Sequence, residues 1–210
     1  DVFHLIHELV KSYSLAIGSR LRQARQALQQ AEEQRSEEQR SEAQAQQAQA
    51  QQAQAQQAQA VVEARAAEVT HWETVHSAYR HHLESVSLTV HPWRICDSTR
   101  QRAADVERQL HAEIDALAAL IDTNGLPGKK KALDKVRKQL VGVSALVDLW
   151  WQGVEHDLQQ VALTPIWTKW VEEVLLPLWY WQAQVARTRC PRRKAQLVQA
   201  LVAVQHAFDT

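Results

Sequence analysis

The absence of helix-breaking residues over a long stretch places the strongest constraint on this fold. Residues 19–91 contain no glycine or proline, and residues 42–60 within them read EAQAQQAQAQQAQAQQAQA. Alanine and glutamine both favour helices, and the whole chain of 210 residues holds only five glycines and five prolines. The sequence therefore predicts an all-α fold.

A low-complexity repeat of five residues fills residues 32–60. It begins as EEQRS, written twice, and drifts into QAQAQ units. Five residues turn a helix by about 140° beyond one full turn, so successive alanines spiral around the axis. A coiled-coil seam needs an apolar repeat of about 3.5 residues. The tract has no such seam, and we expect it to lie in a solvent-exposed arm.

Apolar stripes flank the repeat on both sides and leave two arrangements open. The stripes over residues 2–16 and 61–83 both recur at helical spacing. One arrangement is a single helix of about 70–85 residues, and the other is an antiparallel hairpin that turns inside the tract. We favour the hairpin because each apolar stripe needs a partner that buries it. In either case residues 1–90 form a helical arm.

Residues 91–210 are predicted to form a second unit, a helical bundle that is rich in tryptophan. The sequence HPW at residues 91–93 ends the arm. Ser98-x-x-Gln101 then matches a capping box, which indicates that a helix starts there. Its apolar stripe consists of Val106, Leu110, Ile114, Leu117 and Ile121.

Three further helices complete the predicted bundle. Residues 124–128, NGLPG, are a loop signal, and a helix over about residues 130–161 follows. Thr164-Pro165 has the N-cap and first-turn proline of a helix start. That helix runs to about residue 187 with a kink near Pro177, and the last helix covers residues 192–208.

Six of the eight tryptophans lie between residues 150 and 181. One interpretation is a stacking platform for nucleic-acid bases or a groove for a partner, and the other is a bulky helical core. The core is favoured because base platforms interleave aromatic and basic residues, and only Lys169 lies between these rings. The residues predicted to share one helical face are Trp167, Trp170, Val174, Leu178 and Trp181.

The histidines and cysteines show no complete metal or disulfide pattern. His4, His7 and Glu8 are close together on the first helix, but no further ligands follow at metal-binding spacing. A metal hydrolase built on these three residues is therefore the least favoured interpretation. Cys96 and Cys190 lie far apart, which indicates neither a disulfide framework nor a zinc site.

The net charge is zero, but the charges are unevenly distributed. Residues 1–128 hold 12 basic and 17 acidic side chains, whereas residues 129–210 hold 12 basic and 7 acidic side chains. The basic residues of the second part form two clusters that could hold DNA phosphates, with a solvated surface as the alternative. The clusters are Lys129, Lys130 and Lys131 with Arg137 and Lys138, and Arg187, Arg189, Arg192, Arg193 and Lys194.

Residues 1–9, DVFHLIHEL, resemble a junction found in insertion-sequence transposases of the DDE type. In that family an aspartate ends a strand of a ribonuclease-H-like sheet, and an aromatic–His pair and a helix follow. The resemblance implies that Asp1 is a catalytic, metal-binding carboxylate, one of three that hold two Mg²⁺ or Mn²⁺ ions in the full-length parent. Many members insert a long helical domain between this aspartate and the final glutamate, and this chain resembles that insertion.

The resemblance leads us to expect a piece of a longer bacterial protein, and the chain contains no methionine. This segment alone is expected to be catalytically inert, and to bind transposon-end DNA or to pair protomers through the arm. The second basic cluster supplies the expected phosphate contacts. The alternative is a scaffolding coiled-coil protein without a nucleic-acid role. The sequence predicts no signal peptide or membrane span, and the expected location is the cytoplasm.

Overall fold

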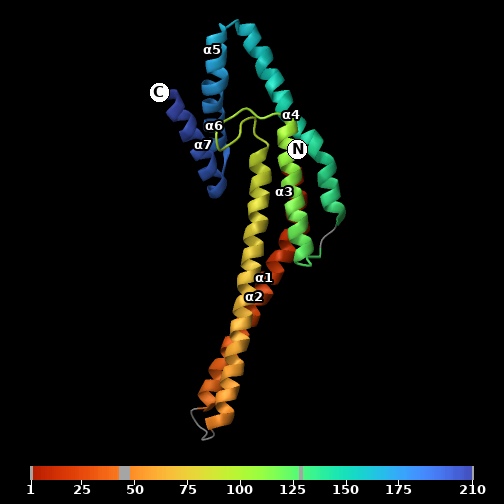
Figure 1. Ribbon diagram of the computed structural model, residues 1–210, viewed down its shortest axis with the longest axis vertical. Helices are drawn as coiled ribbons and strands as arrows, with labels where there is room; N and C mark the ends of the chain where they lie inside the picture. Colours follow the sequence, from red (N-terminus) through yellow and green to blue (C-terminus); the bar gives the residue numbers. More distant parts are fainter. Residues whose placement is uncertain (1, 43–47, 128–129, 210) are drawn as a thin grey trace.

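Every regular element in the described part of the chain is a helix, which confirms the all-α prediction. The computed structural model describes residues 2–42, 48–127 and 130–209. Two long helices extend well beyond the others, which gather at one end (Figure 1). The elements are α1 (Val2–Glu42), α2 (Ala48–Thr89), α3 (Ala103–Thr123), α4 (Lys130–Val161), α5 (Pro165–Trp170), the π-helical turn η1 (Val171–Leu175), α6 (Leu176–Arg187) and α7 (Pro191–Asp209).

Helices α1 and α2 are two adjacent rods of similar length, not one continuous helix. They contain 41 and 42 residues and run side by side from the bundle to the far end of the molecule (Figure 1). The two apolar stripes meet near the bundle, where the Tyr79 hydroxyl donates a hydrogen bond to the Leu9 carbonyl at 3.0 Å. Residues 43–47, which belong to the tract expected to contain the turn, lie outside the described residues.

The outer hairpin, residues 18–42 and 48–74, has little buried surface. Among its side chains with described exposure, only Ala24 and Ala31 are buried. Arg25 and Glu73 form an exposed ion pair across it, with an Nη2–Oε1 distance of 2.8 Å. Exposed pairs typically contribute less than about 1 kcal/mol. The described part of the five-residue repeat therefore lies in a segment whose side chains are mostly exposed to solvent.

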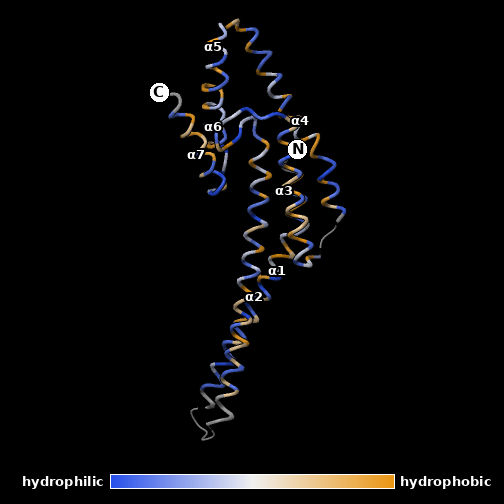
Figure 2. The backbone as a smooth tube through the Cα atoms, viewed as in Figure 1, coloured by the Kyte–Doolittle hydropathy of each residue, from blue (hydrophilic) through white to orange (hydrophobic). Residues whose placement is uncertain are grey.

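One apolar core joins the inner ends of α1 and α2 to the other helices. Hydrophobic and hydrophilic residues alternate along these helices (Figure 2), as expected for helices with one buried side. The predicted stripe of α3 is entirely buried. Because the core contains residues on both sides of position 90, the division at residues 90 and 91 stays a prediction. The contributors from α1, α2 and α4 include Leu5, Leu9, Tyr13, Ile17, Val75, Tyr79, Val86, Val136, Leu140, Val143 and Val147.

The start of α3 is capped from another helix. The predicted capping box at Ser98 and Gln101 is wrong, because α3 begins only at Ala103. Ser98 lies in the preceding loop, and its hydroxyl accepts a hydrogen bond from Trp181 Nε1 at 3.3 Å. The Ala103 N–H instead donates to the Asp148 carboxylate of α4 at 2.9 Å. This carboxylate also suits the positive end of the α3 dipole.

A π-helical turn decides which tryptophans of the C-terminal helices face the core. The Leu176 N–H donates to the Val171 carbonyl, five residues back, just before Pro177, which has no N–H to donate. One extra residue in a turn rotates the preceding segment by about 100° relative to a continuous α-helix. Trp181 is fully buried, whereas Trp167 is 56% exposed. The predicted common face of these two tryptophans is therefore wrong.

An aromatic cluster connects the loop after α2 with α4 and α6. The ring centroid of Trp93 lies 5.0 Å from those of Trp150 and Trp151 and 5.2 Å from that of Tyr180. Trp93 and Trp151 are buried, and Trp151 Nε1 donates to the Pro92 carbonyl at 3.3 Å. These rings pack as a core and do not form an open stacking platform.

His91 lies against this cluster in its neutral form. Its Nδ1 is 2.7 Å from the Tyr180 hydroxyl, and its ring lies edge-on to Trp181 with centroids 5.2 Å apart. Burial and, to a smaller extent, the positive charge of Arg193 lower the pKa of His91 to about 4. Burial also raises the pKa of Tyr180, so the Tyr180 hydroxyl keeps its hydrogen and shares a hydrogen bond with the neutral imidazole.

Replacing the capping carboxylate should destabilise the fold. We expect Asp148→Ala to lower the free energy of unfolding by about 1 kcal/mol, because the Ala103 N–H loses its acceptor. Asp148→Asn keeps an acceptor and should lose less. Chemical denaturation of both variants measures the effect, with Gln160→Ala, an exposed substitution on the same helix, as the control. Equal stability of Asp148→Ala and the control would contradict the interhelical cap.

The half-buried, neutral His91 should make the protein sensitive to acid. Between pH 6.5 and pH 4 the unfolded chain binds a proton at this residue and the folded chain does not. Stability should therefore fall by up to about 3 kcal/mol as the pH drops through this window. His91→Gln should flatten this dependence in denaturation curves measured across the same window. Parallel stability–pH curves for the two proteins would show that His91 is not the responsible group.

Candidate nucleic-acid interface

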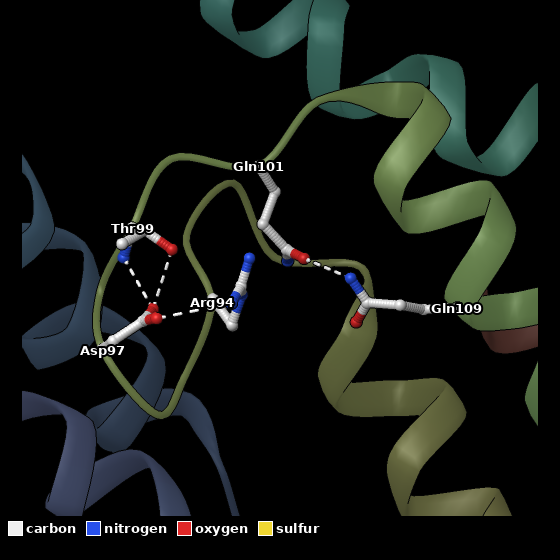
Figure 3. Close-up of polar contacts among 5 residues, drawn as sticks. All are labelled: Arg94, Asp97, Thr99, Gln101 and Gln109. Atoms are coloured by element: carbon white, nitrogen blue, oxygen red, sulfur yellow. Dashed lines mark hydrogen bonds and ion pairs between the residues drawn. The ribbon is translucent and has the colours of Figure 1, made fainter.

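The loop over residues 90–102 connects α2 to α3 and forms a compact hairpin (Figure 3). The Arg94 N–H donates to the Thr99 carbonyl, and the Ser98 N–H donates to the Arg94 carbonyl, both at 2.8 Å. The Asp97 carboxylate accepts the backbone N–H of Thr99 at 3.0 Å and its hydroxyl at 2.8 Å. Short polar side chains thus fix the tip of the loop by bonding to nearby backbone.

Gln101 fixes the base of the same loop. This side chain is buried, and its Nε2 donates to the carbonyls of Thr89 at 3.0 Å and His91 at 2.9 Å. Its Oε1 accepts a hydrogen bond from Gln109 Nε2 of α3 at 3.2 Å (Figure 3). A buried amide needs such partners because an unpaired polar group costs about 1–3 kcal/mol. Gln101 therefore ties the end of α2 to the first turns of α3.

Helix α7 begins directly after Cys190, which is its N-cap by position. The Lys194 N–H donates to the Cys190 carbonyl at 2.9 Å. The backbone N–H of Arg193 hydrogen-bonds the Cys190 thiol and, with Arg192 N–H and the Arg193 side chain, lowers its pKa despite partial burial. N–H groups at a helix start favour negative charge, so this junction is locally suited to an anion.

The basic residues of the junction differ in their partners. Arg193 Nη1 donates to the Ser87 hydroxyl of α2 at 2.7 Å, and Arg192 Nε lies 3.7 Å from a carboxylate oxygen of Glu84, also in α2. The other three predicted phosphate ligands are exposed, and no carboxylate among the described residues forms an ion pair with them. These three are Arg187 at the end of α6, Arg189 in the connection and Lys194 in α7.

The structure does not bring the two basic clusters together. Lys131 is exposed in the first turn of α4, Lys130 begins that helix, and Lys129 lies outside the described residues. The start of α4 and the α6–α7 junction lie on opposite sides of α2 and α3 (Figure 1). One short ligand surface therefore cannot include both clusters.

An open pocket of about 630 Å³, with polar and apolar side chains in its wall, adjoins the junction. It lies between the end of α2, the loop over residues 90–102, α3 and α7, and four glutamines contribute to its wall. Its one carboxylate, that of Glu113, is bound by His82 Nδ1 at 2.7 Å. Gln196 Oε1 of α7 is buried and has no hydrogen-bond partner in the described structure. The lining residues are Ser85, Leu88, Thr89, Arg94, Ile95, Cys96, Gln101, Gln109, Glu113, Gln196 and Gln199.

The predicted carboxylate and histidine sites are not assembled in the described part of the chain. Asp1 lies outside it, so the metal ligand implied by the transposase resemblance has no described geometry. His7 is exposed, and Glu8 pairs with Lys135 of α4 at 3.5 Å. Among the described residues, no three His, Cys, Asp or Glu side chains converge as a metal site would require.

Sequence reasoning missed the glutamines of the pocket and the contacts of the junction with α2. The sequence pattern places Gln101 in a capping box, and it gives no indication that Gln109 or Gln196 lines a pocket. The pairs Arg192–Glu84 and Arg193–Ser87 join residues more than 100 positions apart. A spacing rule along one helix cannot find such pairs, because they depend on how α7 returns to α2.

Searches for related proteins do not assign this site to a family. In the described residues, no helix combines the length and apolar character that crossing a membrane needs. Comparison of the chain with protein-family models, with curated proteins and with solved structures gives no match.

Proposed function

We propose that this chain is a helical DNA-binding module whose α6–α7 junction holds backbone phosphates of duplex DNA. In this proposal it is the helical insertion of a bacterial DDE-type transposase-like protein, as the resemblance of residues 1–9 implies. Alone it would be catalytically inert, and Asp1 would hold Mg²⁺ or Mn²⁺ only within the parent. Such a role would place the protein in the cytoplasm.

The observation that carries the proposal is the group of exposed cations at a junction fixed by α2. Arg187, Arg189 and Lys194 have no carboxylate partner among the described residues, so their charges are available to a ligand. Arg192 and Arg193 hold the start of α7 against α2 through Glu84 and Ser87. The exposed charges therefore project from a fixed turn, which lowers the entropy cost of binding.

Phosphate is the ligand group that suits this surface best. Arginine presents a planar fork of donors that matches phosphate oxygens, and each neutralised phosphate releases counterions from the DNA. Phosphate contacts position a protein on a duplex without reading its sequence. The proposed junction therefore supplies affinity and orientation, while sequence preference would come from elsewhere in the parent protein.

The alternative is a scaffolding protein without a nucleic-acid role. The observation that favours it is a row of exposed apolar residues on α4, Val141, Leu146 and Leu149, which belong to a different helix from the two that form the α6–α7 junction. The two roles require different surfaces, so variants can separate them.

Neutralising the three exposed cations should weaken DNA binding and its dependence on salt. Fluorescence anisotropy with a labelled duplex measures the association constant at a series of salt concentrations. The logarithm of this constant falls linearly with the logarithm of the salt concentration. For the triple variant Arg187→Gln, Arg189→Gln and Lys194→Gln we expect the steepness of this line to fall by up to about 2.7, or about 0.9 for each lost phosphate contact.

A matched control removes the same charge elsewhere. Arg25, Arg65 and Arg108 are exposed and paired with Glu73, Glu68 and Asp105, and their combined replacement by glutamine should leave binding nearly unchanged. Equal losses in both triple variants would indicate a general charge effect. No binding of the wild-type chain at low salt would overturn the proposed function.

A further inference from the structure

Helix α4 buries one side and leaves an apolar face on the other. The buried side includes Val136, Leu140, Val143 and Val147, which pack in the common core. On the opposite side Val141 is 58% exposed, Leu146 49% and Leu149 62%. Gly142, Ala145 and Gly153 are also exposed. We call these six exposed residues the outer α4 face.

The outer α4 face is narrow and smooth enough to receive another helix. Positions 142, 145, 146, 149 and 153 fall within about 100° of arc on a helical projection. A Cβ atom added at Gly142 or Gly153 would meet no atom within 4 Å. Small residues at such positions let two helix backbones approach closely, while Leu146 and Leu149 supply apolar area. The described part of the chain contains no helix that covers this face.

The charges at the two ends of this face have opposite signs. Residues 131–138 contain Lys131, Lys135, Arg137 and Lys138 and one acid, Asp134. Lys135 and Arg137 form ion pairs with acids of the same chain, which leaves Lys131 and Lys138 for a partner. Residues 154–161 contain Glu155 and Asp157 and no basic residue except His156. Glu155 is paired with Arg100 of the same chain, which leaves Asp157 for a partner. An antiparallel copy of α4 that crosses the first at Leu146 places residues 131–138 of each copy opposite residues 154–161 of the other. A parallel copy would place like charges together.

We propose that a second copy of this chain docks on the outer α4 face in antiparallel orientation, about a twofold axis near Leu146. The contact is self-complementary, as a twofold interface must be. Lys138 of one copy then lies within about one helical turn of Asp157 of the other. Neither residue forms an ion pair within the described part of the chain, so both are available for this contact.

The size of the face sets the expected strength of the dimer. From Lys138 to Asp157 it extends about 30 Å along the helix. One helix pair of this length buries less than the ~800 Å² per partner of a standard stable interface. The dimer should therefore be reversible, with a dissociation constant in the micromolar range. This pairing uses α4 and differs from the pairing through the arm that the sequence suggested.

The central test places a charge on the twofold axis. In sedimentation equilibrium the wild-type chain should show a concentration-dependent monomer–dimer mixture, and Leu146→Glu should be monomeric at the same concentrations. Leu15→Glu is the control, because Leu15 is an exposed apolar residue of α1 outside the face. Circular dichroism of each variant confirms that it is folded. A monomeric wild-type chain, or dimerisation of Leu146→Glu equal to that of the control, would overturn the proposal.

Charge exchange tests the antiparallel orientation. Lys138→Glu and Asp157→Lys should each raise the dissociation constant several-fold, and the double variant should restore it. Failure of the double variant to recover would overturn the antiparallel orientation. DNA binding is measured separately at the α6–α7 junction, so a wild-type chain that binds DNA but stays monomeric would contradict this proposal alone.

Discussion

The burial of Trp93 is the interaction on which the rest of the bundle depends. Its ring contacts Trp150 and Trp151 of α4 and Tyr180 of α6, so the loop after α2 is the meeting point of elements far apart in sequence. Replacing a buried aromatic ring with a small side chain typically costs about 3–5 kcal/mol. Without this ring, α6 would lose part of its contact with the loop after α2, and its hydrogen bonds to His91 and Ser98 would have to hold it there.

The polar groups beside this aromatic cluster have hydrogen-bond partners, as groups removed from water require. Gln101 satisfies two carbonyls at the end of α2 and joins Gln109 of α3. His91 stays neutral and shares a hydrogen bond with the Tyr180 hydroxyl. Hydrogen bonds require a defined orientation of the groups that they join, whereas apolar packing requires only that the side chains lie close together. The loop thereby fixes both the start of α3 and the approach of α6, and it forms one wall of the open pocket.

The sequence predicts the fold correctly where the spacing of apolar residues along a single helix determines which of its side chains are buried. The stripe from Val106 to Ile121 is buried as predicted, and α4 occupies the expected residues, because 3.6-residue spacing and loop signals are local information. Most of the failures involve partners distant in sequence, and one involves the local π-helical turn η1. Asp148 caps α3 from a different helix, η1 rotates Trp167 away from Trp181, and α2 holds Arg192 and Arg193. The basic residues were identifiable from sequence, but which of them remain exposed depends on these long-range contacts.

The two proposed surfaces become related if both proposals hold. A twofold axis near Leu146 would duplicate the α6–α7 junction, so that one dimer presents two equivalent basic turns. Two phosphate-binding turns linked in this way bind one duplex more tightly than either alone, provided that their separation matches the DNA. The net charge of zero is no obstacle to DNA binding, because the exposed cations of the junction act locally on the nearest phosphates. Charge pairing at the dimer interface would leave the junction as the exposed positive surface.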